Sequence, residues 1–298
     1  MQNMSEGKIC RRDMLKLGAS AAIAAGLMGT SVLIGDEKHA RLSKALGVGM
    51  LQNTAPSDAE RFAIARKCGF EGIEAEPLGS LDAMREQAQA AKQAGVPIHG
   101  LMFNGWTSPL SAAEPEVVKK GLAGMENALR CASAIGVNTV LLVPAVVTED
   151  VTYAQAYERS QKHIRELLPL AAELKVVVAI ENVWNKFLLS PLEFARYIDE
   201  FDSPWVRAYF DVGNCIVNGY AQDWIRTVGR RIIKVHVKDF KRQGNKWMNL
   251  LDGDVNWLQV RRALDEIGYE GILTAEVSGG GEEYLTDLAK RMDKIIAM

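Results

Sequence analysis

Four short apolar runs in the last third of the chain each end in a residue that can bind a metal ion. The runs read VVVAIE, VRAYFD, IIKVH and GILTAE, and they end at Glu181, Asp211, His236 and Glu276. A charged residue that closes a buried strand is costly unless it has a partner. Two Glu, one Asp and one His form an oxygen-rich set with one imidazole, which suits a divalent Mn, Co, Mg or Zn ion. We therefore expect one metal ion at these four residues rather than four ordinary polar strand ends.

The elements that must position these residues alternate between strand-like and helix-like segments from Lys44 onward. Short runs rich in Val, Ile and Leu, separated by segments of helical spacing, are typical of parallel strands buried on both faces. The predicted strands are Ala45–Leu51, Gly72–Ala75, Pro97–Met102, Val137–Val143, Val176–Glu181, Val206–Asp211, Ile232–His236 and Gly271–Glu276. Eight such strand-then-helix units predict an α/β fold, a (β/α)8 TIM barrel that forms a single domain over residues 41–298.

This topology explains how residues far apart in the sequence could share one site. In a barrel, the carboxyl ends of all strands meet at one mouth, where the active sites of this fold lie. The four candidate ligands end the fifth, sixth, seventh and eighth predicted strands, which are neighbours around the ring. We therefore expect all four to face one point.

The N-terminal segment, residues 1–40, is set apart from the barrel by its composition. Arg11 and Arg12 precede an uncharged stretch from Leu17 to Gly35, a pattern that resembles a twin-arginine export signal. This segment predicts an exported, periplasmic protein with no stable membrane association once the signal is cleaved. The alternative is an N-terminal membrane anchor, since a stretch of this length nearly spans a bilayer.

Composition excludes several partner classes. The chain has 298 residues, 48% of them hydrophobic, and a net charge of -2 with no basic run, so nucleic acid is not an expected partner. The four cysteines form no CxxC pair, and we expect neither a disulfide framework nor a structural zinc site.

The motifs around the four ligands resemble a known superfamily. IEN at 180–182, FDVGN at 210–214, KVHVKD at 234–239 and TAEV at 274–277, with ligand spacings of 30, 25 and 40 residues, are similar to those of the xylose isomerase-like sugar (phosphate) isomerase/epimerase superfamily. Within it, the chain looks closest to the ketose and ketose-phosphate 3-epimerases and the hexulose-phosphate isomerases. The resemblance covers the chain from about Lys44 to its end.

The resemblance implies roles for individual residues. Glu181, Asp211, His236 and Glu276 match the ligands of one divalent ion, commonly Mn, and the two glutamates match the acid/base pair. Arg242 matches a substrate-binding Arg of the tagatose 3-epimerase-like members. Those members carry His where this chain has Asn214, although an Asn can still donate a hydrogen bond to a substrate oxygen.

Elementary chemistry agrees with these roles. A proton beside a ketose carbonyl is too weakly acidic for an unaided carboxylate, so a metal must stabilise the enediolate that forms. Glu181 and Glu276 lie at the two ends of the ligand arc, so that one can remove a proton and the other can return it. Return to the same carbon gives epimerisation, whereas return to the adjacent carbon gives isomerisation of an aldose and a ketose. A lyase similar to inosose dehydratases and a non-catalytic sugar-binding protein remain the alternatives.

Further polar and aromatic residues fall where they could contact a sugar. Trp184 follows the fifth predicted strand, and an aromatic ring can cover the apolar face of a sugar. His99, in the third predicted strand, is as compatible with a substrate contact as with a buried structural role. Glu74 or Glu76 could reach the mouth as a weaker candidate for a substrate contact, and Lys238 and Asp239 are as compatible with a local ion pair as with a substrate role. The expected partner is a small sugar, and related barrels suggest a dimer or tetramer.

Overall fold

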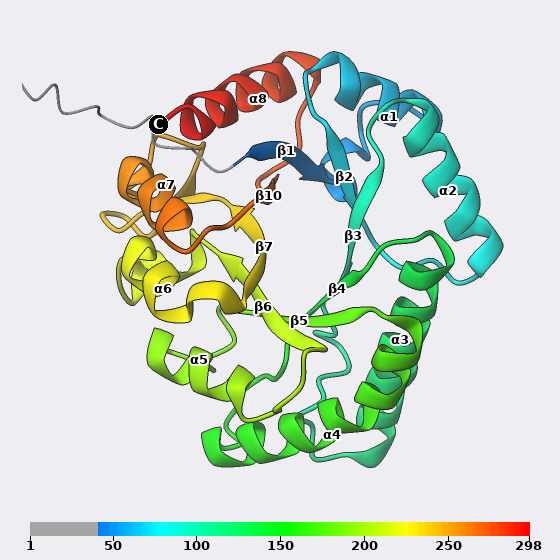
Figure 1. Ribbon diagram of the computed structural model, residues 1–298, viewed down its shortest axis with the longest axis vertical. Coiled ribbons are helices and arrows are strands. Elements are labelled where there is room, and N and C mark those ends of the chain that lie inside the picture. Colours follow the sequence, from blue (N-terminus) through cyan, green and yellow to red (C-terminus); the bar gives the residue numbers. More distant parts are fainter. Residues whose placement is uncertain (1–40) are drawn as a thin grey trace, which may run out of the picture. The chain divides into compact units, whose positions relative to one another are not determined.

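The computed structural model describes residues 41–298, and within them eight parallel strands close into a barrel in the order β1-β10-β7-β6-β5-β4-β3-β2. Figure 1 looks into this ring and shows β1 beside β10, with the helices arranged around the outside. The strands are β1 (Leu42–Gly47), β2 (Gly72–Ala75), β3 (Ile98–Phe103), β4 (Thr139–Leu142), β5 (Val177–Glu181), β6 (Val206–Asp211), β7 (Ile232–Val237) and β10 (Gly271–Ala275). The predicted (β/α)8 barrel is confirmed, while the predicted leader at 1–40 lies outside the described residues.

Eight α-helices follow the barrel strands within residues 41–298. They are α1 (Asp58–Lys67), α2 (Leu81–Gln93), α3 (Pro115–Ala134), α4 (Tyr153–Leu174), α5 (Pro191–Asp199), α6 (Ala221–Val228), α7 (Trp257–Glu266) and α8 (Glu282–Ile296). Local sequence sets several of their starts. Ser57 and Glu60 form a capping box at α1, and the Ser80 and Ser190 side chains cap α2 and α5, which satisfies amides that have no partner within the helix.

The first predicted strand is displaced from the observed one. The apolar run 45–51 predicted a strand to Leu51, but β1 ends at Gly47 and Val48–Leu51 forms a 3-10 helix. Met50 and Leu51 of that turn are buried in the main core. Both conformations bury apolar side chains, so hydrophobicity alone does not place the end of this strand.

A small hairpin on the catalytic side of the barrel was not predicted. Strand β8 (Asp239–Lys241) pairs with β9 (Lys246–Met248) in antiparallel register. The connecting turn contains Gly244 and Asn245, both with positive φ, which are residue types that tolerate this conformation. The hairpin begins two residues after the end of β7, and its residues Trp247 and Met248 line a cavity together with Glu276.

The apolar core and the barrel interior differ in chemistry. The large cluster of buried apolar residues includes strand side chains such as Ile73, Val140 and Val235 together with helix side chains such as Phe62 and Met125. Inside the barrel, in contrast, several polar side chains meet across the ring.

The described residues contain no helix with both the length and the apolar character needed to cross a bilayer. Cys68, Cys131 and Cys215 are buried free thiols.

Candidate metal centre and active site

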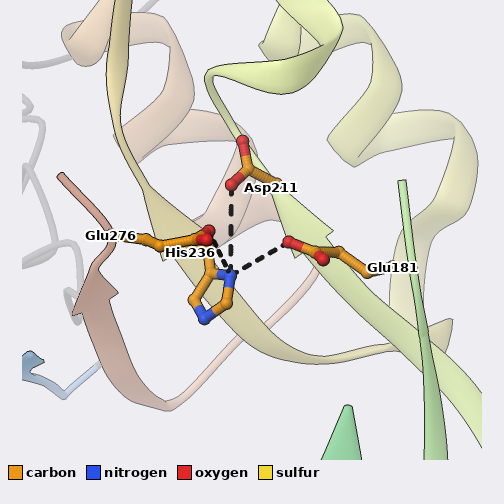
Figure 2. A group of neighbouring side chains, drawn as sticks. All are labelled: Glu181, Asp211, His236 and Glu276. Carbon is orange, nitrogen blue, oxygen red and sulfur yellow. Dashed lines mark hydrogen bonds and ion pairs between the residues drawn. The ribbon is translucent and has the colours of Figure 1, made fainter. Parts of the chain in front are cut away.

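The four predicted ligands converge at the carboxyl ends of consecutive strands. One ligand atom from each of Glu181, Asp211, His236 and Glu276 lies within 4.8 Å of the others. Strand register explains part of this convergence, because Asp211 on β6 is the direct partner of His236 on β7. Figure 2 shows the three carboxylates pointing towards Nδ1 of the histidine, with Glu181 and Glu276 on opposite sides of it.

Distances within this cluster suit a cation at its centre. Nδ1 of His236 lies 3.0 Å from Oε1 of Glu181, 3.0 Å from Oε2 of Glu276 and 4.0 Å from Oδ2 of Asp211. A divalent ion bonds oxygen and nitrogen at about 2.0–2.2 Å, so neighbouring ligand atoms lie about 3–3.5 Å apart and opposite ones about 4–4.5 Å apart.

The hydrogen bonding of the cluster leaves room for such an ion. Within residues 41–298, the buried oxygens Oδ2 of Asp211 and Oε2 of Glu276 accept no hydrogen bond of ordinary geometry, and their near neighbours are the Lys238 ammonium group, at 3.1 and 2.8 Å, and the His236 ring. Three carboxylates gathered at one buried point need positive charge beside them, which a divalent ion can supply. The donor set, three carboxylates and one imidazole nitrogen, is also appropriate for a divalent metal. The four residues therefore fit the predicted cation.

Glu74 on β2 contacts the His236 ring at Nε2, the nitrogen that points away from the ligand cluster. Its Oε2 lies 2.6 Å from Nε2 of His236, and both side chains are buried. A proton held on Nε2 by this carboxylate leaves the lone pair of Nδ1 directed at the ligand cluster. The sequence suggested Glu74 only as a weak substrate contact, and its alternation with exposed Glu76 gave no sign of a histidine partner.

Asp211 is fixed by a set of amide groups. The backbone N–H of Asn214 donates to Oδ1 of Asp211 at 2.6 Å, and the Asn182 side chain bonds both backbone polar groups of Asp211 at 2.9 Å. The side-chain amide of Asn214 donates to the carbonyl of Asn182 at 2.9 Å. These bonds hold one oxygen of Asp211 and leave the other facing the cluster. They also occupy one of the two side-chain N–H donors of Asn214, the residue that the sequence had suggested for a substrate contact.

The two candidate acid/base residues have pKa values shifted in opposite directions. Burial raises the pKa of Glu181 to about 7, with a further contribution from Glu276. Burial also acts to raise the pKa of Glu276, but the neighbouring His236 and Lys238 outweigh it and lower that pKa below its ordinary value. A pair of carboxyl groups whose environments separate their pKa values is typical of acid/base sites.

The side chain of Lys238, two residues beyond His236 in the sequence, brings a positive charge to the cluster. Its Nζ is 3.1 Å from Oδ2 of Asp211 and 2.8 Å from Oε2 of Glu276. The sequence left Lys238 undecided between a local ion pair and a substrate contact. Asp239, which the sequence suggested together with Lys238, has a structural role. Its carboxylate accepts hydrogen bonds from three backbone amides and from Nε1 of Trp257.

Two cavities lie beside this cluster. The first, of about 510 Å³, is lined by Lys238, Glu276, Trp247 and Tyr284 among others. The second, of about 330 Å³, is lined by Trp184 and Asn214 and by apolar residues of the loop after β5. The rings of Trp184 and Trp247 stack with their centroids 4.8 Å apart. Both rings are nearly half exposed, so the mouth offers aromatic surface that could pack on a sugar face.

The other two predicted substrate residues have protein partners. Arg242 donates from its guanidinium to the carbonyls of Ile216 and Gly219 at 2.9 and 2.8 Å. His99 is the second residue of β3, and its ring nitrogens lie 3.1 Å from Nζ of Lys234 and from Oγ1 of Thr274. Because β7 and β10 are across the ring from β3, the His99 side chain lies inside the barrel below the mouth. Their roles in substrate binding stay predictions.

Comparison with known proteins agrees with this picture. Residues 62–295 match the family model described as "Xylose isomerase-like TIM barrel". L-ribulose-5-phosphate 3-epimerase UlaE of Escherichia coli O1:K1 / APEC is 26% identical over 277 residues, which cover 86% of this chain and 96% of that protein.

Solved structures share the fold at lower identity. Apo 3-keto-D-glucoside 4-epimerase YcjR from E. coli has a TM-score of 0.73 at 16% identity, covering 87% of this chain and 100% of that one. D-psicose 3-epimerase in the presence of D-fructose has a TM-score of 0.67 at 18% identity, covering 86% and 94%. The family match spans most of the barrel, and it agrees with the motifs around the four ligands. This chain therefore belongs to the xylose isomerase-like TIM barrel family.

Proposed function

We propose that this protein is a divalent-metal-dependent sugar epimerase or isomerase that acts on a ketose or ketose phosphate. The observation that carries the proposal is the placement of Glu181 and Glu276 on opposite sides of Nδ1 of His236, each 3.0 Å from it. Two carboxylates that flank one point can reach the two faces of a planar intermediate held between them. The names of the relatives, which include an L-ribulose-5-phosphate 3-epimerase, support the same reaction class.

The proposed division of labour follows from the geometry. Glu181, Asp211, His236 and Glu276 would hold the ion, for which the family resemblance indicates Mn, with Co, Mg or Zn as substitutes. A divalent ion bound there would polarise the substrate carbonyl and so acidify the neighbouring C–H. One of the two glutamates removes that proton and the other returns a proton from the opposite face, which inverts the carbon. Trp184 and Trp247 cover the substrate and exclude water from it.

The test is the isosteric substitution Glu276→Gln, assayed by deuterium uptake from heavy water into a panel of ketoses and ketose phosphates with Mn added. General acid/base groups contribute about 10²–10⁴-fold to rate, so we expect exchange to fall at least about 100-fold. Glu270→Gln is the matched control, because exposed Glu270 precedes the opposite end of the same strand, β10. Undiminished exchange in Glu276→Gln would refute the assignment.

The lyase alternative gives a different product. Loss of water from the substrate, seen as a mass decrease without recovery of an epimer, would replace the epimerase assignment with a dehydratase on the same residues. Binding of a sugar without exchange or water loss would favour the non-catalytic alternative.

We also propose that the protein is exported to the periplasm through residues 1–40. Replacement of Arg11 and Arg12 by Lys should retain the protein in the cytoplasm, measured by cell fractionation. Unchanged periplasmic recovery of this variant would contradict the twin-arginine route, and recovery of the unaltered protein with membranes would favour the anchor.

A further inference from the structure

Lys238 contacts the ligand cluster but has no role in the proposed reaction. Its ammonium group bridges Oδ2 of Asp211 and Oε2 of Glu276, at 3.1 and 2.8 Å. Only 13% of its side chain is exposed, and the Asp211 side chain is fully buried. The protein therefore places a permanent cation against the same oxygens that a divalent ion would need.

The backbone is shaped to admit this lysine. A side-chain carbon at Gly213 would lie 2.4 Å from Cγ of Lys238 and 2.8 Å from its carbonyl oxygen. Gly213 has φ of -75°, so its conformation suits any residue, and the requirement for glycine here is steric. The lysine stem thus passes closely over the loop that follows Asp211, which makes its contact with the ligand cluster a built feature of the site.

The same lysine also faces the larger cavity. Lys238 lines the 510 Å³ space together with Glu276 and Trp247, and its Nζ lies 5.3 Å from the centre of a Trp247 ring. An aromatic face stabilises a nearby ammonium group. The side chain therefore borders both the ligand cluster and the space beside it in which a substrate would lie.

We propose that Lys238 is a positioning residue that exchanges partners when the metal binds. In the metal-free protein its ammonium group neutralises Asp211 and Glu276 and keeps the ligand set assembled. When a divalent ion takes these oxygens, it repels the ammonium group, which becomes available as a hydrogen-bond donor to substrate oxygens in the cavity. This inference rests on the proposed metal-dependent function and adds to it a cation that competes with the metal.

In Lys238→Met, the affinity for Mn should rise and the melting temperature of the metal-free protein should fall. Loss of the competing cation should tighten Mn binding about tenfold or more. The apparent affinity for Mn is proportional to the fraction of molecules in which the site is free, and Lys238 keeps that fraction small in the unaltered protein. The metal-free variant should nevertheless melt at least about 2 °C lower, because its clustered carboxylates lose their counter-charge. A lysine with a purely structural role would, in contrast, weaken metal binding and lower stability together.

The experiment titrates Mn into metal-free protein by calorimetry and records thermal unfolding of the same samples. Lys238→Arg should weaken Mn binding, because a guanidinium pairs with two carboxylate oxygens more effectively than an ammonium group. Lys246→Met is the matched control for loss of charge, because Lys246 is exposed on the hairpin that follows Lys238, and its Mn affinity should equal that of the unaltered protein. Lys238→Gln replaces the Met variant if the latter does not fold.

The outcomes separate the two proposals. Mn binding by the unaltered protein with equal or weaker binding by Lys238→Met would overturn the partner exchange while leaving the metal centre intact. No Mn binding by the unaltered protein would overturn the metal centre and the exchange together. In Mn-saturated protein, Lys238→Met should raise KM for the ketose, and an unchanged KM would overturn the substrate contact.

Discussion

Glu74 should control how tightly His236 binds the metal, although it is not a ligand itself. Oε2 of Glu74 lies 2.6 Å from Nε2 of His236, with 1% and 0% of the two side chains exposed. Glu74→Gln preserves the shape and can still accept a hydrogen bond, but it removes the negative charge. Since a hydrogen bond to a charged group is worth roughly 1.5–3 kcal/mol and a neutral one roughly 0.5–1.5, the variant should lose about 1–2 kcal/mol of support for the ligand.

That loss converts to about a fivefold to thirtyfold weaker metal affinity, at about 1.4 kcal/mol per factor of ten. The range overlaps the 10–100-fold effects typical of residues that orient metal ligands. The assay is a calorimetric titration of metal-free protein with Mn, after circular dichroism has established that the variant is folded. Glu76→Gln is the matched control, because Glu76 follows Glu74 by two residues and is exposed. Equal Mn affinities for Glu74→Gln and Glu76→Gln would refute the orienting role.

Stability measurements test the polar contacts elsewhere in the barrel. Burial lowers the pKa of His99 to about 3, with Lys234 adding to the effect, so as the pH falls below 6.5 the unfolded chain gains a proton that the native protein does not. The unfolding free energy should therefore fall by roughly 1.6 kcal/mol as the pH falls from 6.5 to 5. His99→Gln should abolish that part of the pH dependence in urea titrations. Asp239→Ala should cost roughly 3 kcal/mol, because it leaves the buried Nε1 of Trp257 and backbone amides without an acceptor; a change below about 0.5 kcal/mol would contradict this role. Gly253→Ala should also destabilise the protein, because the added carbon would lie 2.1 Å from Oδ1 of Asp239, and an unchanged urea midpoint would show that the loop can move aside.

The barrel and its ligand cluster could be predicted because both depend on strong local signals. Apolar runs that end in Glu181, Asp211, His236 or Glu276 mark strand ends, and parallel topology then brings these ends to one mouth. No long-range packing detail is needed for that inference. The family match agrees with it independently.

What could not be predicted depends on contacts between distant segments. Glu74 on β2 meets His236 on β7 only because the closed barrel brings the two side chains together across its interior. Its sequence context, GIEAEP, gives no sign of that partner. The Asp239 carboxylate likewise collects donors as distant as Trp257, which no local pattern indicates. The contact of Lys238 with two ligands depends on the space left by Gly213.

The central claim is that Glu181, Asp211, His236 and Glu276 bind one divalent metal ion. The most direct measurement is the metal content of purified protein after incubation with Mn and removal of excess, compared with that of His236→Ala. We predict about one equivalent of Mn in the unaltered protein and none in the variant. No bound metal in the unaltered protein, or one equivalent retained without His236, would contradict the site described here.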